Sequence, residues 1–286
     1  MAAAEGKTVR VDAHQHFWDY DERQYPWIQK DWPIRKPFLP PDLKPLLARE
    51  KFDYCVAVQA RQTFEETIWL LELAKEHAFV AGVVGWIDLL ADSLKAVPYQ
   101  LERIERDKLV GVRHVVQDEP NDEFVLRTDF LCGIASLEEY DLAYDILIFP
   151  KQLRAAIELV RKFPEQRFVL DHIAKPLIRD GKMEPWKAQI AELAKWPNVF
   201  CKLSGMVTEA KWGDWKRTEF KPYLDVVWEA FGEDRLMIGS DWPVCLLGGE
   251  YSTVIGIVQD YLKQFTESTR DKVLGGNAVK FYKLKV

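Results

Sequence analysis

Residues 54–87, YCVAVQARQTFEETIWLLELAKEHAFVAGVVGWI, contain one full period of the pattern that determines the fold of this 286-residue chain. The apolar runs at the two ends of the stretch show no alternation with polar residues, which is typical of strands buried on both faces. Between them, Glu65–His77 has apolar residues at helical spacing, with Thr63 as its predicted N-cap and Glu66 three residues further on. The stretch is therefore predicted to form a strand–helix–strand unit.

The same alternation continues along the chain. Eight apolar runs begin 25 to 45 residues apart, and a strand with its crossover helix takes about 30 residues or more. This rhythm predicts a single-domain (β/α)8 TIM barrel spanning residues 1–286. The alternative, an open doubly wound sheet, is disfavoured because no GxGxxG motif follows any run. The runs are Val9–Ala13, Tyr54–Gln59, Val80–Ile87, Leu109–Val116, Ala143–Phe149, Phe168–His172, Val199–Ser204 and Leu236–Ser240, and further helices are expected at Pro150–Phe163, Trp186–Trp196, Lys221–Phe231, Thr253–Phe265 and Thr269–Tyr282.

One segment interrupts this rhythm and should distort the barrel. Phe17–Pro41 is rich in tryptophan and proline and follows neither a helical nor a strand period. As an insertion after the first strand, it belongs to the face on which the loops between strands and helices build the active site of a barrel. The sequence leaves open whether this aromatic, proline-rich insertion lines the pocket or packs on the barrel as an irregular cap.

Charge and composition argue against several classes of protein. The 39 Lys and Arg residues against 45 Asp and Glu leave a net charge of −6, whereas nucleic-acid-binding proteins usually carry a basic surface. The longest nearly uncharged apolar run, Ala78–Ile87, has ten residues, and a membrane span needs roughly 20. No secretory signal is visible, and the four cysteines are far apart. We therefore expect a cytoplasmic protein that binds neither nucleic acid nor membrane.

Titratable side chains collect at the ends of the predicted strands, where barrel enzymes carry their catalytic residues. The first strand ends in Asp12-Ala-His14-Gln-His16. Because strand side chains alternate, His14 and His16 point to the same face. Two imidazoles placed in this way are able to bind one divalent metal ion. Two core or solvated histidines are the structural alternative.

The positions of the other histidines favour the metal hypothesis. Four of the five histidines in the chain lie at strand ends, and His114 and His172 complete that set. Asp241 follows the eighth strand, and in a closed barrel a carboxylate at this point is well placed to meet His14 and His16. A helix N-cap or an acid in a surface loop is its structural alternative.

The strand-end motifs resemble those of the amidohydrolase superfamily, and in particular the amidohydrolase 2 branch, which contains sugar-lactone hydrolases such as L-fuconolactonase and L-rhamnonolactonase. They occur in the order expected for that branch, from residue 8 to residue 245, and are not specific to one substrate. The matching motifs are Asp12-Ala-His-Gln-His16-Phe-Trp18, Gly111-Val-Arg-His114, Asp171-His172 with Lys175-Pro176, Cys201-Lys-Leu-Ser-Gly205 and Gly239-Ser-Asp-Trp-Pro243.

The resemblance implies a role for each matching residue. His14 and His16 correspond to the metal-binding pair of the first strand, His172 to a further histidine ligand, and Asp241 to the acid of the eighth strand. That acid also binds the metal, takes a proton from the attacking water and later returns it to the leaving oxygen. The implied cofactor is one divalent metal ion, zinc in the first place and manganese as the alternative.

The chain also departs from the pattern of the superfamily. Fuller metal sites use a bridging Lys or Glu on the fourth strand and a histidine on the fifth, whereas this chain has Arg113-His114 on the fourth and no histidine on the fifth. A binuclear site is therefore not expected. Ala174 stands where relatives usually have glycine. Metal-independent catalysis is left open, because some members of the branch are believed to need no metal, and the strand-end histidines with Arg113 and Lys202 would then supply the electrophile.

Other strand-end residues are candidates for substrate binding. Arg113 and Lys202 carry positive charges that suit a substrate carboxylate. Because neighbouring strand residues face opposite sides, we expect His114 to point into the barrel as a catalytic residue and Arg113 to brace the adjacent layer. Trp86 and Gln59 end the third and second strands and are candidates for contacts with a sugar ring, with packing at the barrel rim as the alternative.

Together these features predict a hydrolase that opens the ring of a small sugar lactone, with Asp241 as general base. The first alternative is a lactone isomerase that moves the acyl group between hydroxyls. A second is a metal-dependent decarboxylase of the same superfamily. A non-catalytic binding or scaffold barrel is disfavoured, since such a protein has no need of titratable groups at strand ends. The expected partner is the small-molecule lactone, and the sequence leaves assembly into a homo-oligomer open.

Overall fold

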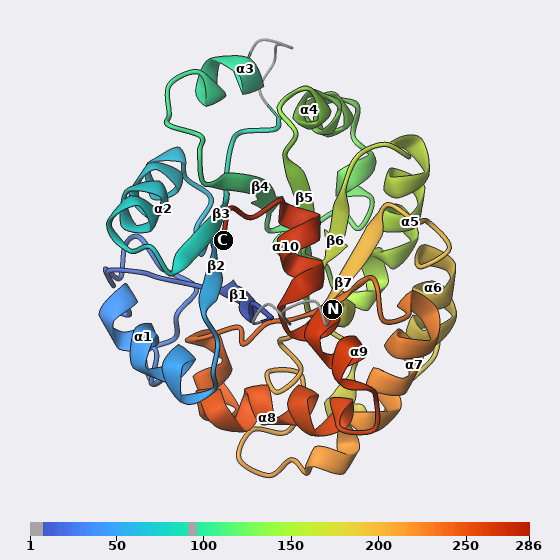
Figure 1. Cartoon of the computed structure of the whole chain (residues 1–286). Helices are drawn as coiled ribbons and strands as arrows, with labels where there is room; N and C mark the ends of the chain where they lie inside the picture. Colours follow the sequence, from blue (N-terminus) through green and yellow to red (C-terminus); the bar gives the residue numbers. More distant parts are fainter. Residues whose placement is uncertain (1–7, 91–95) are drawn as a thin grey trace, which may run out of the picture.

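The computed structural model describes residues 8–90 and 96–286. Its eight parallel strands follow one another in chain order around a nearly closed barrel, with helices between them (Figure 1). The predicted single-domain (β/α)8 fold is therefore confirmed, while the predicted boundary at residue 1 lies outside the described residues. The strands are β1 (Val11–Gln15), β2 (Tyr54–Val58), β3 (Val80–Gly85), β4 (Leu109–His114), β5 (Ala143–Ile146), β6 (Phe168–Leu170), β7 (Val199–Leu203) and β8 (Leu236–Ile238).

The helices largely match the sequence prediction. The exception is the C-terminal segment, where the single helix expected at Thr269–Tyr282 is divided by a π-helical turn, Lys272–Gly276. Two consecutive glycines end this turn, and glycine is a poor helix former. The helices are α1 (Pro40–Arg49), α2 (Phe64–Glu76), α3 (Ala96–Leu101), α4 (Thr128–Glu139), α5 (Leu153–Lys162), α6 (Trp186–Leu193), α7 (Lys221–Phe231), α8 (Tyr251–Leu262), α9 (Glu267–Asp271) and α10 (Asn277–Tyr282). None of the helices in the described ranges is long and apolar enough to cross a membrane.

Helix α10 closes one end of the barrel. It lies across the ring of strands in Figure 1 and contacts β1 and β8. Its side chains Phe281 and Tyr282 join an apolar cluster inside the barrel that includes Val11, Val56 and Val169. This cluster fills the end of the barrel opposite the strand termini that carry the candidate site residues.

The barrel closes between β8 and β1 through side-chain and loop contacts. In the described residues no continuous ladder joins these two strands, and a single bridge pairs Gln15 with Trp242. The buried carboxylate of Asp12 accepts a hydrogen bond from the backbone N of Ser240 at 2.8 Å. The backbone N of Asp241 donates to the carbonyl of His14, also at 2.8 Å. These contacts bring the residues after β8 next to the end of β1.

The insertion at Phe17–Pro41 packs as an irregular cap on this seam. Trp18 and Phe38 pair through two backbone hydrogen bonds, and both side chains are buried. The ring of Phe38 meets Trp242 edge to face at a centroid distance of 5.2 Å. Trp18 stacks on His16 at 6.5 Å. The insertion thus packs against the residues that follow β1 and β8 and supports them.

Glu66 ties this cap to the loop after β2. Thr63 is the N-cap of α2, as predicted, because its hydroxyl accepts the backbone N–H of Glu66 at 3.2 Å. The Glu66 carboxylate accepts hydrogen bonds from the backbone of Ala60 and Arg61, and from the hydroxyl of Tyr25 in the insertion. Burial is the largest influence on this carboxyl and raises its pKa from 4.5 to about 7.

The raised pKa predicts a pH-dependent contribution to stability. The protonated carboxyl is favoured in the folded state, so the stabilisation is complete below the unfolded pKa and is lost as the pH rises through the folded pKa. Relative to Glu66→Gln, which stays neutral, the wild-type free energy of unfolding should fall by about 3 kcal/mol between pH 4.5 and pH 7. Urea unfolding across this window measures the difference.

The matched control is Glu65→Gln, an exposed neighbour in the same helical turn. It should keep the pH dependence of the wild type. A parallel pH dependence in wild type and Glu66→Gln would contradict the prediction.

Candidate metal centre and active site

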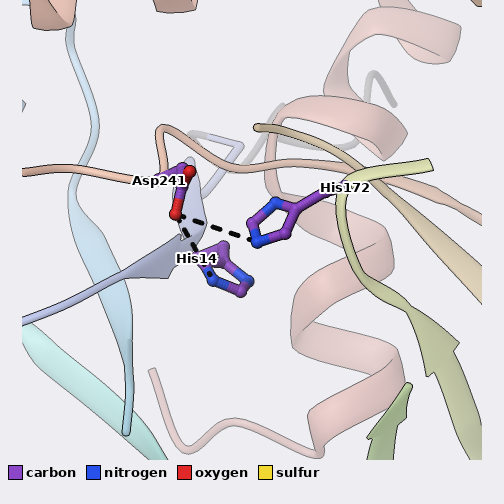
Figure 2. Close-up of side chains that lie close together, drawn as sticks. All are labelled: His14, His172 and Asp241. Carbon is purple, nitrogen blue, oxygen red and sulfur yellow. Dashed lines mark ion pairs between the residues drawn. The ribbon is translucent and has the colours of Figure 1, made fainter. Parts of the chain in front are cut away.

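Three side chains from separate elements converge at the carboxyl ends of the strands. His14 comes from β1, His172 from the turn after β6, and Asp241 from the segment after β8 (Figure 2). The Nε2 atoms of both histidines lie 3.8 Å from Oδ1 of Asp241. All three residues are buried, and their nearest ligand atoms lie within 4.8 Å of one another. The set combines imidazole nitrogens with a carboxylate oxygen, which are the ligand types that zinc prefers.

His16 extends this cluster. Its Nδ1 lies 2.8 Å from the carbonyl oxygen of Val58, so Nδ1 carries the hydrogen and donates it. The Nε2 atom of a neutral His16 then presents a lone pair 3.2 Å from Oδ1 of Asp241. Two acceptors at this distance repel each other unless a cation or a proton lies with them. The lone pairs of His16 Nε2 and Asp241 Oδ1 are therefore arranged as ligand atoms for a divalent cation between them.

An unusual backbone turn presents His172. The four residues His172–Lys175 all have φ between 49° and 59°, the left-handed region, which costs roughly 1–2 kcal/mol for each non-glycine residue. Ala174, the departure noted in the sequence, is one of them. Such strain persists only where the surrounding structure enforces it, and it gathers at functional sites. Asp241, with a φ of 58°, is strained in the same way.

Two glycines leave room for the histidine rings. A Cβ on Gly205 would lie 2.4 Å from Nδ1 of His172, and Gly205 also has a φ of +62°. A Cβ on Gly239 would lie 2.6 Å from the Cβ of His14. The neighbouring Ser204 hydroxyl lies 2.9 Å from Nδ1 of His172 and orients the ring. The motif glycines after β7 and β8 are therefore explained by close packing around the two rings.

Burial sets the charge states of the cluster. It lowers the pKa of His172 and of His14 well below 6.5, and nearby Lys202 lowers that of His14 further. Both rings are therefore neutral at neutral pH, the form that binds metals. Burial alone would raise the pKa of Asp241, but the neighbouring His172, His16 and Lys175 outweigh it and leave that pKa below 3.8. Asp241 is an ionised carboxylate at neutral pH.

A network of charged residues lies directly beside the cluster, inside the barrel. The ammonium of Lys202 is fully buried and lies 2.5 Å from Oδ2 of Asp145 and 3.0 Å from Oδ1 of Asp171. Arg113 binds the other oxygen of Asp171 at 3.0 Å, and the same guanidinium nitrogen lies 3.3 Å from Nε2 of His14. Two cations thus balance two carboxylates in a low-dielectric interior, as buried charges require.

The structure reverses the expected orientation of the fourth strand. Arg113 points into the barrel, whereas His114 points outward and pairs with Glu119 at 2.7 Å. The imidazole of His114 stacks on Phe124 at 4.9 Å and contacts Phe130 of α4. The physical reason is that the charged neighbours of Arg113 lie in the interior, while an aromatic pocket under α4 accepts the imidazole. His114 is therefore not brought to the cluster.

Lys202 and Arg113, the predicted contacts for a substrate carboxylate, are held by carboxylates of the chain itself, and their role in substrate binding stays a prediction. Lys202 is fully buried and Arg113 is 4% exposed, and both are paired with carboxylates of the chain itself. Sequence reasoning gave no role to Asp145 and Asp171, the partners that hold these cations. An isolated aspartate in the apolar fifth strand was the available signal, because a buried charge needs an opposite charge.

Gln59 and Trp86 keep polar atoms that have no partner. Within the described ranges, neither Oε1 of Gln59 nor Nε1 of Trp86 makes a hydrogen bond, although both atoms are buried. Nε2 of Gln59 donates to the carbonyl of Arg113, which holds the side chain at the end of β2. Buried polar groups without partners call for an explanation such as a water or a ligand.

The packing of Gly205 against His172 predicts a specific defect. Gly205→Ala should weaken zinc binding by about tenfold or more, because the added Cβ displaces a ring that belongs to the donor set. Competition with a chromogenic chelator measures the affinity. Gly181→Ala is the matched control, since Gly181 also has a φ of +62° but no atom within 4 Å of an added Cβ. Both substitutions place alanine in the same left-handed backbone conformation, so they share the same backbone strain. Equal zinc affinities of the two variants would therefore contradict the prediction.

Comparison with known proteins agrees with this geometry. The chain is 39% identical to an L-fucono-1,5-lactonase of Burkholderia multivorans over 96% of each chain. It is also 39% identical to an L-fucono-1,5-lactonase of Burkholderia ambifaria, over 97% of this chain and 96% of that one. A crystal structure of an amidohydrolase from Burkholderia multivorans with bound zinc superposes with a TM-score of 0.92 at 39% identity, covering 96% of this chain and 99% of that chain.

The family model described as amidohydrolase matches residues 11–284. That range runs from the start of β1 to two residues past the end of α10 and includes every residue of the His14, His172 and Asp241 cluster. The resemblance seen in the strand-end motifs is therefore confirmed: the chain belongs to the amidohydrolase family.

Proposed function

We propose that the chain hydrolyses the ring ester of a small sugar lactone, with Asp241 as general base. The observation that carries this proposal is the ionised, buried carboxylate of Asp241 held among His14, His16 and His172 at the carboxyl ends of the strands. The relatives named as lactonases, at 39% identity, favour hydrolysis over isomerisation and decarboxylation. An aldonolactone is the proposed substrate class.

His14, His172 and Asp241 are the proposed ligands of one divalent ion, with His16 beside them. Zinc is the proposed ion because the donors are nitrogen and carboxylate oxygen, and manganese is the alternative. When bound, such a cation polarises the ester carbonyl and lowers the pKa of an attacking water toward ~7. The neutral imidazoles that burial maintains are suited to hold it without competition from protons.

Asp241 accepts the proton of the attacking water and later returns it to the leaving ring oxygen. Its low pKa keeps the carboxylate free to accept at neutral pH. The backbone hydrogen bond to the carbonyl of His14 holds it in place. The proposed base, Asp241, therefore lies beside the proposed metal ligands His14 and His172. Attack on a bound ester requires the reacting groups to be held close together in this way.

Gln59 and Trp86 are the proposed contacts for the sugar hydroxyls. Their unpaired Oε1 and Nε1 atoms supply one acceptor and one donor. A site that leaves such groups unpaired in the absence of substrate discriminates strongly for hydroxylated rings. The cytoplasmic location and the absence of nucleic-acid and membrane partners stay predictions, and a homo-oligomer stays a possible assembly.

Removal of the proposed base is the first test. Asp241→Asn should lower lactone hydrolysis by about 100-fold or more, because the amide cannot accept the proton, while the folded state is retained. Acid release from a panel of aldonolactones, followed with a pH indicator, measures it. The control is Asp88→Asn, an aspartate after β3 that lies outside the cluster and caps the backbone of Leu90. Retained activity in Asp241→Asn would remove this residue from the base role.

The same assay tests the cation and the reaction class. Activity lost on chelation and recovered with zinc or manganese supports the metal site, whereas activity that ignores the chelator shifts the electrophile to protein side chains. NMR of the product separates the alternatives, because a hydrolase yields the free acid and an isomerase retains the ring ester.

A further inference from the structure

Two buried carboxylates share Lys202, but only one of them borders the metal cluster. Asp145 and Asp171 both lie in the barrel interior with no exposed surface, and both pair with the Lys202 ammonium. Oδ1 of Asp171 also lies 3.4 Å from Nδ1 of His14. Asp145 instead accepts the hydroxyl of Tyr282 from α10 at 2.8 Å. The two acids are therefore matched in burial and in their pair with Lys202, and they differ in that Asp171 also contacts His14 and Arg113.

The hydrogen on the His14 ring has two possible positions, and each has a different partner. The Lys202 ammonium lies 3.1 Å from Nδ1. Because an ammonium only donates, a hydrogen bond from Lys202 requires a lone pair on Nδ1 and the hydrogen of the neutral ring on Nε2. Nη1 of Arg113, 3.3 Å from Nε2, favours the other tautomer, since a guanidinium can only donate to a lone pair on Nε2. Nε2 is the atom that lies 3.8 Å from Oδ1 of Asp241, and a cation bound to it would replace the contact with Arg113. In the tautomer that Lys202 favours, however, His14 has no lone pair to offer a cation there.

Metal binding through Nε2 requires the opposite tautomer. With the hydrogen on Nδ1, the ring needs an acceptor on that side, and Lys202 cannot be one. Oδ1 of Asp171, 3.4 Å from Nδ1, is the carboxylate oxygen within reach; the Lys202 ammonium pairs with it at 3.0 Å and leaves a lone pair for Nδ1–H. Arg113 holds the other oxygen of the same carboxylate at 3.0 Å and so fixes its orientation.

We propose that Asp171 is the positioning residue that holds His14 in its metal-binding tautomer. In the cation-loaded protein, Nδ1–H of His14 donates to Oδ1 of Asp171, and Lys202 keeps its pairs with Asp145 and Asp171 while giving up its hydrogen bond to the ring. This inference rests on the proposed metal site. A carboxylate that accepts the distal N–H of a ligating histidine fixes both the tautomer and the direction of the ring.

Zinc affinity of two matched variants tests the proposal without any measurement of turnover. Asp171→Asn should weaken zinc binding by about ten- to hundredfold, because an amide cannot satisfy His14, Arg113 and Lys202 together. Asp145→Asn removes the same charge beside the same lysine and should bind zinc about as tightly as the wild type. Equal losses in the two variants would overturn the proposal, because they would point to the shared charge and not to the contact with His14.

A measurement on the wild-type chain covers the case in which the buried variants fail to fold. Nitrogen-15 NMR of the five histidines, with and without zinc, reports which ring nitrogen carries the hydrogen. The proposal expects the His14 hydrogen on Nδ1 when zinc is bound, with the zinc on Nε2. A hydrogen on Nε2 in the zinc-bound protein, or coordination through Nδ1, would overturn it. Failure of the wild type to bind zinc would overturn the metal site and this inference together, whereas intact zinc binding without lactone hydrolysis would overturn the proposed function alone.

Discussion

The site depends on how the barrel closes between its last and first strands. The backbone of Asp241 donates to the carbonyl of His14, and the carboxylate of Asp12 accepts the backbone N–H of Ser240. These contacts place the acid after β8 within 3.8 Å of a histidine that precedes it by more than 200 residues. Without this closure, the proposed metal ligand His14 on β1 and the proposed base Asp241 after β8 would lie at opposite edges of an open sheet.

The same closure places charged groups in an interior that excludes water. Lys202 and Arg113 balance Asp145 and Asp171, and Tyr282 of the C-terminal helix joins them through Asp145. Burial of an unpaired charge is costly, so the four groups and the helix that closes the barrel depend on one another. Structural support for the fold and support for the His14 ring are therefore provided by the same residues.

Much of the site could be predicted because strand ends in a barrel share one face. The repeating apolar runs located those ends, and the alternation of strand side chains paired His14 with His16. The same alternation predicted that only one of Arg113 and His114 points into the barrel, but it did not determine which of the two does so. The choice depends on partners distant in sequence: Asp171 attracts the guanidinium inward, and Phe124 with Phe130 accepts the imidazole outside.

By itself, the sequence determined the barrel, its irregular insertion and the residue types at the ends of its strands, because periodicity and strand order are local properties. Tertiary structure alone decided the hydrogen-bond partners of each titratable group. It placed Lys202 and Arg113 in a buried network of charges, and it brought Asp171 to the His14 ring. The physical reason is that charges and tautomers are set by the nearest atoms in space, and in a closed barrel these come from strands far apart in the chain.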